Sequence, residues 1–221
     1  PQGRLLSQIE KEAVLSLMKE IDCRGLILDL ACGSGRFTRL ATDIHYGVVS
    51  ADISLRFLKL MQQQSRSQCL NLVLCDAEQL PFRDTSFDCV ITIRFIPLLP
   101  YDVMRHVLTE IRRVTNGFVI FNSANQLSVI VLLQVAWKIC RKRVGYYPLR
   151  LVTLERTLKA VGLEILKRRT PLLVPPRRFP KLLLSFVESI NKIGNKSSLG
   201  HLSEQYFLLA RRRIALQKDS N

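Results

Sequence analysis

The chain is short of histidine, aromatic residues and acidic residues. Together with the spacing of its cysteines, the small number of histidines speaks against a metal site. Its 221 residues include 3 His, 7% aromatic residues, and 18 Asp or Glu against 33 Lys or Arg. The six cysteines form no CxxC pair and have no histidine nearby at ligand spacing, which favours free thiols in a reducing compartment over disulfides or zinc. We expect no metal site.

Long apolar runs are missing as well. The longest, residues 127–140, is interrupted by polar side chains and is too short for a membrane-spanning helix. The first residues alternate polar and apolar side chains, unlike a signal peptide. We therefore expect a cytoplasmic protein, with peripheral contact to a membrane left open.

The chain has the composition of one folded domain over residues 1–221, with 48% apolar and 23% charged residues. Its charge is uneven. Residues 1–120 hold 14 basic and 13 acidic residues, a net charge of +1, whereas residues 121–221 hold 19 and 5, a net charge of +14. A surface this basic attracts anions such as phosphate-bearing substrates, nucleic acid or an anionic membrane.

Short apolar runs alternate with stretches of helical periodicity along the chain. Helices are expected over the first ~20 residues and over 34–42, 55–64, 102–114 and 153–161, the last ending in a glycine cap. Strands are expected at 26–30, 47–51, 70–74, 87–93, 118–121, 163–167 and 205–211. This alternation predicts an α/β fold with a seven-stranded, mostly parallel sheet and helices on both faces.

A glycine-rich turn follows the first expected strand, in the segment LILDLACGSGRFT at residues 26–38. Gly33 and Gly35 allow a ligand to approach the backbone, and the following helix offers free N–H groups. A dinucleotide fingerprint requires a third glycine, and Thr38 stands in its place. By itself the turn is weak evidence, because a purely structural strand–helix connection is the alternative interpretation.

Three acidic residues strengthen the case for a ligand site. Asp52 ends the second strand, where a carboxylate can accept both hydroxyls of a ribose. Asp76 follows the third strand, where it can accept from an adenine amine. Asp29 lies inside the first strand, where a charge requires a partner. All three are expected at the carboxyl edge of the sheet.

With these motifs the sequence resembles the class I S-adenosylmethionine-dependent methyltransferases of the small-molecule type, over residues 5–122 and again at 153–167 and 205–211. The resemblance implies a Rossmann-like fold, S-adenosylmethionine as cofactor, and methyl transfer as the reaction. It also implies a set of cofactor-binding residues, namely Asp29, Ala31, Gly33, Gly35, Asp52, Ile53, Asp76, Ala77 and Arg94. Arg94 is expected at the methionine end of the cofactor, and Ile53 beside the adenine.

The acceptor side is less defined. By resemblance, residues 125–150 and 170–203 form a lid over the acceptor, while residues 1–124 form the cofactor-binding half. An oxygen acceptor needs a general base, for which His201 and Tyr146 are the candidates; packing of the insertion is an equal interpretation for Tyr146. His106 is interpreted as a surface or packing residue.

The basic second half leaves the acceptor class open. Apolar helical segments beside basic clusters at 141–143 and 177–178 suit an anionic membrane interface or a packed lid, and an acceptor such as a lipid, quinone or glycolipid precursor. Two alternatives are an RNA-binding methyltransferase and a non-catalytic RNA-binding protein. Nucleic acid is less favoured because the basic stretches contain aliphatic residues in place of stacking aromatics. The oligomeric state is not indicated.

Overall fold

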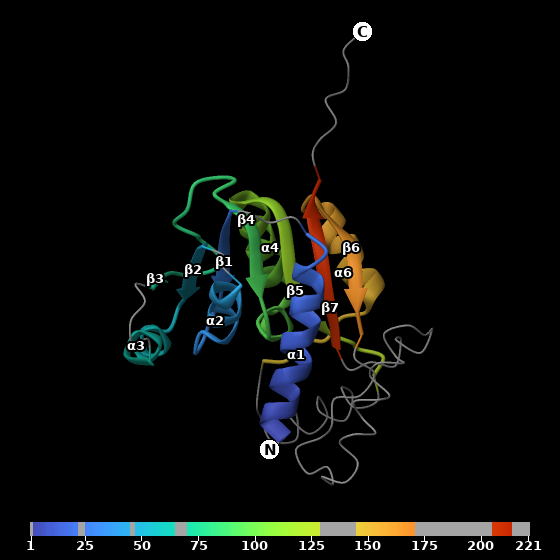
Figure 1. Ribbon diagram of the computed structural model, residues 1–221. Helices are drawn as coiled ribbons and strands as arrows, with labels where there is room; N and C mark the ends of the chain where they lie inside the picture. Colours follow the sequence, from blue (N-terminus) through green and yellow to red (C-terminus); the bar gives the residue numbers. More distant parts are fainter. Residues whose placement is uncertain are drawn as a thin grey trace.

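The computed structural model describes residues 2–21, 25–44, 47–64, 70–128, 145–170 and 205–213, with side chains from Ser7 onward (Figure 1). The strands are β1 (Leu26–Leu30), β2 (Gly47–Asp52), β3 (Asn71–Leu74), β4 (Phe87–Thr92), β5 (Thr115–Ala124), β6 (Leu163–Arg169) and β7 (Gln205–Arg212). The helices are α1 (Gln2–Met18), α2 (Arg36–Asp43), α3 (Leu55–Gln64), α4 (Tyr101–Val114) and α6 (Leu151–Ala160), with a short 3-10 helix η1 (Ile96–Leu98).

The seven strands form one sheet in the order β3-β2-β1-β4-β5-β7-β6. Only β7 runs against its neighbours, pairing antiparallel with β5 and β6. The predicted seven-stranded, mostly parallel sheet is therefore confirmed. Because the strand order reverses between β1 and β4, the crevice beyond their carboxyl ends is the position where such sheets bind ligands.

Two layers of helices cover the sheet (Figure 1). On one face α4 and α6 bury Leu108, Ile111 and Leu154 against the strands. On the other face α1 and α2 bury Leu17 and Phe37 in a second cluster. Both faces of the central strands are thus shielded from water, which explains why β1 and β4 consist almost entirely of apolar residues.

The boundaries differ from the prediction mainly at β5. The sequence predicts a strand over 118–121, but the strand extends over Thr115–Ala124. Asn122 and Ser123 look like loop residues, yet they are 1% and 2% exposed because β7 pairs with them along its whole length. The expected glycine cap is present, since Gly162 follows α6 with a φ of 82°.

Candidate cofactor site

The glycine-rich turn after β1 contains three residues in the left-handed region, with φ of 55° at Ala31, 56° at Gly33 and 74° at Gly35. The two glycines serve different purposes. A Cβ added to Gly33 would meet no atom within 4 Å, so this backbone borders open space. A Cβ on Gly35 would lie 2.5 Å from Cε of Met61, so Gly35 allows α3 to pack close to the turn. Gly33 is therefore the glycine that leaves room for a ligand.

Asp29 is 3% exposed in β1, and its required partner is a hydroxyl. Thr38 donates from Oγ1 to Oδ2 of Asp29 at 2.6 Å, and the same hydroxyl lies 2.8 Å from Oγ of Ser50. Burial raises the pKa of Asp29 to about 6, although the Thr38 hydrogen bonds and the charge of Arg36 act in the opposite direction. The threonine that breaks the dinucleotide fingerprint is thus the residue that stabilises this carboxylate.

Asp52 joins the end of β2 to the glycine-rich turn. Its Oδ2 accepts the Gly33 N–H at 2.8 Å, and its Oδ1 accepts the Ser54 N–H at 2.8 Å. Each carboxylate oxygen has a second acceptor position. The side chain is therefore fixed by the protein backbone and still able to accept two hydroxyl groups from a ligand.

A cavity of about 220 Å³ opens beside Asp52. Five of the predicted residues line it, namely Ala31, Asp52, Ile53, Asp76 and Ala77. Asp76 caps its own turn, because its Oδ1 accepts the Glu78 N–H at 2.9 Å. An apolar part of the lining was not predicted; it consists of Phe95, Leu99, Val103 and Val107. A lining that combines acidic groups with apolar side chains matches the sugar and base of a nucleoside.

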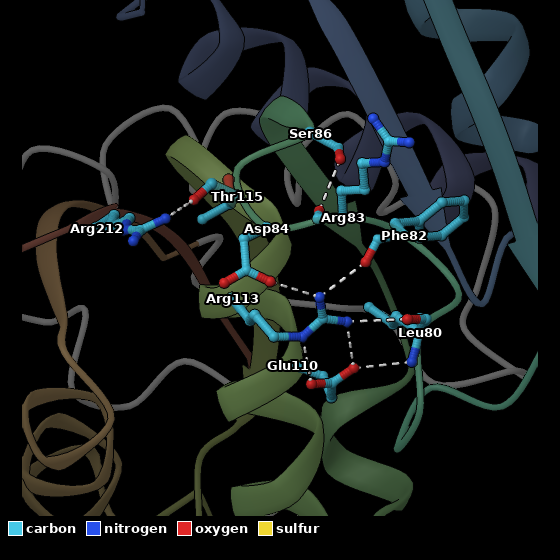
Figure 2. A network of polar contacts seen from close by, with 9 residues as sticks. All are labelled: Leu80, Phe82, Arg83, Asp84, Ser86, Glu110, Arg113, Thr115 and Arg212. Carbon is cyan, nitrogen blue, oxygen red and sulfur yellow. Dashed lines mark hydrogen bonds and ion pairs between the residues drawn. The ribbon is translucent and has the colours of Figure 1, made fainter.

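The loop that carries Asp76 and Ala77 is fastened to α4 by Arg113 (Figure 2). The guanidinium donates to the carbonyl oxygens of Leu80 and Phe82 at 2.9 and 2.7 Å, and to both oxygens of Glu110 at 2.7 and 2.8 Å. Oε2 of Glu110 also accepts the Leu80 N–H at 2.9 Å. These contacts fix one wall of the cavity, and the Arg113 hydrogen bonds hold the pKa of Glu110 below its usual value.

Four predicted residues do not line this cavity: Asp29, Gly33, Gly35 and Arg94. Arg94 follows β4 with a φ of 65°, an unusual conformation for a residue with a side chain. Its N–H donates to Oδ1 of Asn122 at 2.6 Å, and its Nε donates to Oε1 of Glu10 at 2.7 Å.

The sequence prediction missed Glu10, which is fully buried on α1. Glu10, Val14 and Leu17 lie at helical spacing, and all three are 0% exposed. A carboxylate in a buried apolar stripe is costly unless it is paired. That spacing was the signal in the sequence that marked Glu10 as a residue with a specific partner.

A second cavity, of about 310 Å³, lies beyond the carboxyl end of β5. Leu99 lines both cavities, and the second also contains Tyr101, Gln126, Tyr146 and Tyr147. The N–H of Tyr147 donates to the Pro97 carbonyl at 2.7 Å, so this segment is attached to η1. Tyr146 is thus at a cavity, as its candidate role requires.

Other predicted features lie at the surface or beyond the described residues. The His106 side chain is 72% exposed and 3.4 Å from Glu78, as expected for a surface residue. His201 lies outside the described residues, as do most of the two lid segments and the clusters at 141–143 and 177–178.

Several basic residues on β6, on β7 and directly after β7 are paired with acidic side chains. Lys167 and Arg169 both contact Glu20. Arg211 and Arg213 both contact Glu164, at 2.7 and 3.6 Å. These pairs leave less free positive charge on this edge of the sheet than the sequence indicates.

Three cysteines lie in the described part of the chain, Cys32, Cys75 and Cys89, and none of them forms a disulfide there. Within the same ranges no three His, Cys, Asp or Glu side chains gather in a way that would hold a metal ion. No helix among the residues that the structure describes has the length and apolar character needed to cross a bilayer.

Comparison with known proteins agrees with the geometry of the site. Residues 28–121 match the family model described as a methyltransferase domain, a stretch that begins in β1 and ends in β5. Residues 28–121 of the chain therefore correspond to a methyltransferase domain. This match agrees with the predicted family, the class I S-adenosylmethionine-dependent methyltransferases.

Three curated relatives of the domain are named for methyl transfer to different acceptors. Malonyl-[acyl-carrier protein] O-methyltransferase of Hamiltonella defensa is 31% identical over 138 residues, which is 58% of this chain and 52% of that protein. A ubiquinone/menaquinone biosynthesis C-methyltransferase of Erwinia tasmaniensis is 41% identical over 88 residues, 34% of each protein. Probable tRNA methyltransferase 9B of Bos taurus is 28% identical over 101 residues, 46% of this chain and 19% of that protein. The matches therefore span about half or less of these relatives.

Solved structures share the fold. Magnesium protoporphyrin IX methyltransferase from Synechocystis, solved with bound S-adenosylmethionine, superposes with a TM-score of 0.64 and 16% identity, covering 96% of this chain and 82% of that one. At this identity the likeness concerns the fold alone. The predicted Rossmann-like methyltransferase architecture is confirmed.

Proposed function

We propose that this protein binds S-adenosylmethionine in the cavity beside Asp52 and transfers its methyl group to a small, largely apolar acceptor. The observation that carries the proposal is the pair of adjoining cavities that share Leu99. One offers acidic groups to a nucleoside, and the other offers an apolar surface with tyrosines. Two ligands held side by side at one sheet edge are what a group transfer requires.

The described residues fit the cofactor. Asp52 would accept the two ribose hydroxyls with the free acceptor positions of its carboxylate. Asp76 would accept from the adenine amine, and Ile53, 70% exposed, would be covered by the base. Gly33 has the space that a ligand against its backbone needs.

In this proposal three predicted residues hold the glycine-rich turn in place, namely Asp29, Ala31 and Gly35. Asp29 and Thr38 hold the turn to β1, and Gly35 seats the turn on α3. When bound, the cofactor supplies a methyl group on a positively charged sulfur, which is already a strong electrophile. The protein's contribution is then to orient the acceptor and exclude water.

The acceptor cavity favours a molecule with an apolar body and few polar groups. Its walls combine Leu99 and Leu149 with tyrosines and Gln126. Tyr146 is the candidate to take or relay a proton from an oxygen acceptor, together with His201. A lipid, quinone or related precursor suits these walls, and two relatives are named for acyl-carrier-linked and quinone substrates.

An RNA acceptor is the second candidate, because one relative is named as a probable tRNA methyltransferase. The described residues favour it less. Three basic side chains on β6 and β7, and Arg213 directly after β7, are paired with Glu20 or Glu164, and Arg168 lies over the Tyr206 ring at 5.8 Å. A phosphate backbone would have to compete with these contacts.

The test is transfer of a labelled methyl group from S-adenosylmethionine to quinone precursors, anionic lipid vesicles or bulk tRNA. We expect labelling of the apolar small molecules or lipids, and none with Asp52→Ala. Because Asp52 also accepts from Gly33 and Ser54, Asp52→Asn is the companion variant; it keeps one acceptor oxygen. Labelling of tRNA alone would select the second candidate. Cofactor binding without transfer to any acceptor would instead indicate a binding protein.

A further inference from the structure

Glu10, which is buried, forms an ionic cluster with two partly exposed arginines near the switch point of the sheet. The three residues come from α1, from the first position of α2, and from the end of β4. Nε of Arg94 lies 2.7 Å from Oε1 of Glu10. Nη1 of Arg36 lies 2.6 Å from Oε2 of Glu10, which is an ion pair whose geometry is not that of a hydrogen bond. Glu10 itself is 0% exposed.

The two arginines differ in their other contacts and in their exposure to solvent. Arg36 is 22% exposed, donates to Oγ of Ser7 at 3.2 Å, stacks on the Phe37 ring, and acts on the charge of Asp29. The Arg94 side chain is 48% exposed. In the part of the chain that the structure describes, its two terminal nitrogens contact no acceptor. Arg94 is therefore the cation of the cluster that can receive a ligand.

The backbone of Arg94 also adopts a disfavoured conformation. A side chain at φ 65° is disfavoured, and such conformations persist where the surroundings fix them. Asn122 of β5 fixes the N–H, and Glu10 fixes the guanidinium. Since β1 and β4 are neighbours in the sheet, Arg94 follows β4 beside the turn that contains Gly33. Strain maintained from two sides at a ligand edge indicates a functional purpose.

We propose that Glu10 is a positioning residue, which holds the Arg94 guanidinium so that its terminal nitrogens receive the carboxylate of the cofactor's methionine portion. This inference rests on the proposed cofactor site. A planar guanidinium can bind a carboxylate through two parallel hydrogen bonds, but only when its plane is fixed. Glu10 supplies that fixation through Nε and leaves the other two nitrogens free. Helix α1, which lies outside the matched methyltransferase domain, thereby becomes part of the cofactor site.

The test compares two ligands that differ in the amino-acid portion: S-adenosylhomocysteine, which has the carboxylate, and 5′-methylthioadenosine, which lacks it. Titrations are run on the unmodified protein, Glu10→Gln, Arg94→Met and the double variant. Glu10→Gln keeps the volume and one acceptor oxygen, so the fold is expected to persist. Glu12→Gln is the matched control, because Glu12 is exposed on the same helix and accepts a hydrogen bond from Gln8.

We expect Glu10→Gln to weaken S-adenosylhomocysteine roughly three- to tenfold, the usual cost of ordering one long side chain on binding, and to leave 5′-methylthioadenosine unchanged. In the Arg94→Met background the same substitution should have no further effect. Equal losses for both ligands, or a loss that persists without Arg94, would show a purely structural role and overturn the proposal. If the unmodified protein binds neither ligand, the proposed cofactor site itself fails.

Discussion

Removing Arg113 should destabilise the protein and loosen the wall of the cofactor cavity. The change is Arg113→Met, which keeps the aliphatic stem and deletes the charged fork. Five hydrogen bonds are lost, to Glu110, Asp84 and the carbonyls of Leu80 and Phe82 (Figure 2). The Asp84 side chain is 72% exposed, so that pair contributes little.

The magnitude follows from the remaining contacts. The two carbonyls and the Glu110 pair contribute about 1 kcal/mol each after allowance for partial exposure, a total of about 3 kcal/mol. For a domain of this size, 1 kcal/mol corresponds to a shift of about 2–4 °C in Tm, so Tm should fall by about 6–12 °C. Arg113→Lys should recover only part of this, since an ammonium cannot reproduce the fork.

The assay is thermal unfolding at neutral pH, with Arg105→Met as control, because Arg105 is exposed on the same helix. The pKa of Glu110 is lowered in the folded state, so the stabilisation is present above its unfolded pKa and is lost as pH falls through the folded value. The gap between the protein and the variant should therefore narrow in acid. A Tm for Arg113→Met equal to that of the control would refute the reasoning.

Two further predictions concern the glycine-rich turn and its carboxylate. Burial raises the pKa of Asp29 to about 6, so its contribution to stability is fully present below the unfolded pKa of 3.8 and is lost as pH rises through 6. As the pH rises from 4 to 8, the unfolding free energy of Asp29→Asn should therefore increase relative to that of the unmodified protein by on the order of 2 kcal/mol, measured by urea unfolding. A difference in unfolding free energy that does not change with pH would contradict this. Gly33→Ala places a methyl group in open space at φ 56°, so it should cost about 1–2 kcal/mol of stability and weaken S-adenosylhomocysteine more than tenfold by calorimetry. Unchanged affinity would show that no ligand approaches Gly33.

The sequence was most informative where one local rule decides the structure. Apolar runs separated by helical stretches determine the parallel core, and strand-end acids necessarily meet at one edge of it. The positions of Asp52 and Asp76 at a common cavity could therefore be predicted from the sequence. The ends of β5 could not, because polar Asn122 and Ser123 are buried only through pairing with β7, about 83 residues later in the chain.

Contacts between distant elements explain the other residues that sequence reasoning missed. Phe95 and Leu99 lie in a segment without periodicity, so nothing local indicates that they form the apolar wall of the cavity. Glu10 is 84 residues from Arg94, and only the folded chain brings them together. The amount of unpaired positive charge around β6 and β7 could not be predicted either, because the sequence does not show that Glu20 and Glu164 pair with arginines there.

The most direct test of the central claim is calorimetric titration of the purified protein with S-adenosylmethionine and S-adenosylhomocysteine, with NAD as the control ligand. The site combines Asp52, Asp76 and an open Gly33, and it lacks the third glycine of a dinucleotide turn. We predict binding of the first two ligands in the micromolar range and no binding of NAD. Binding of NAD, or of none of the three, would contradict the assignment of this cavity to S-adenosylmethionine.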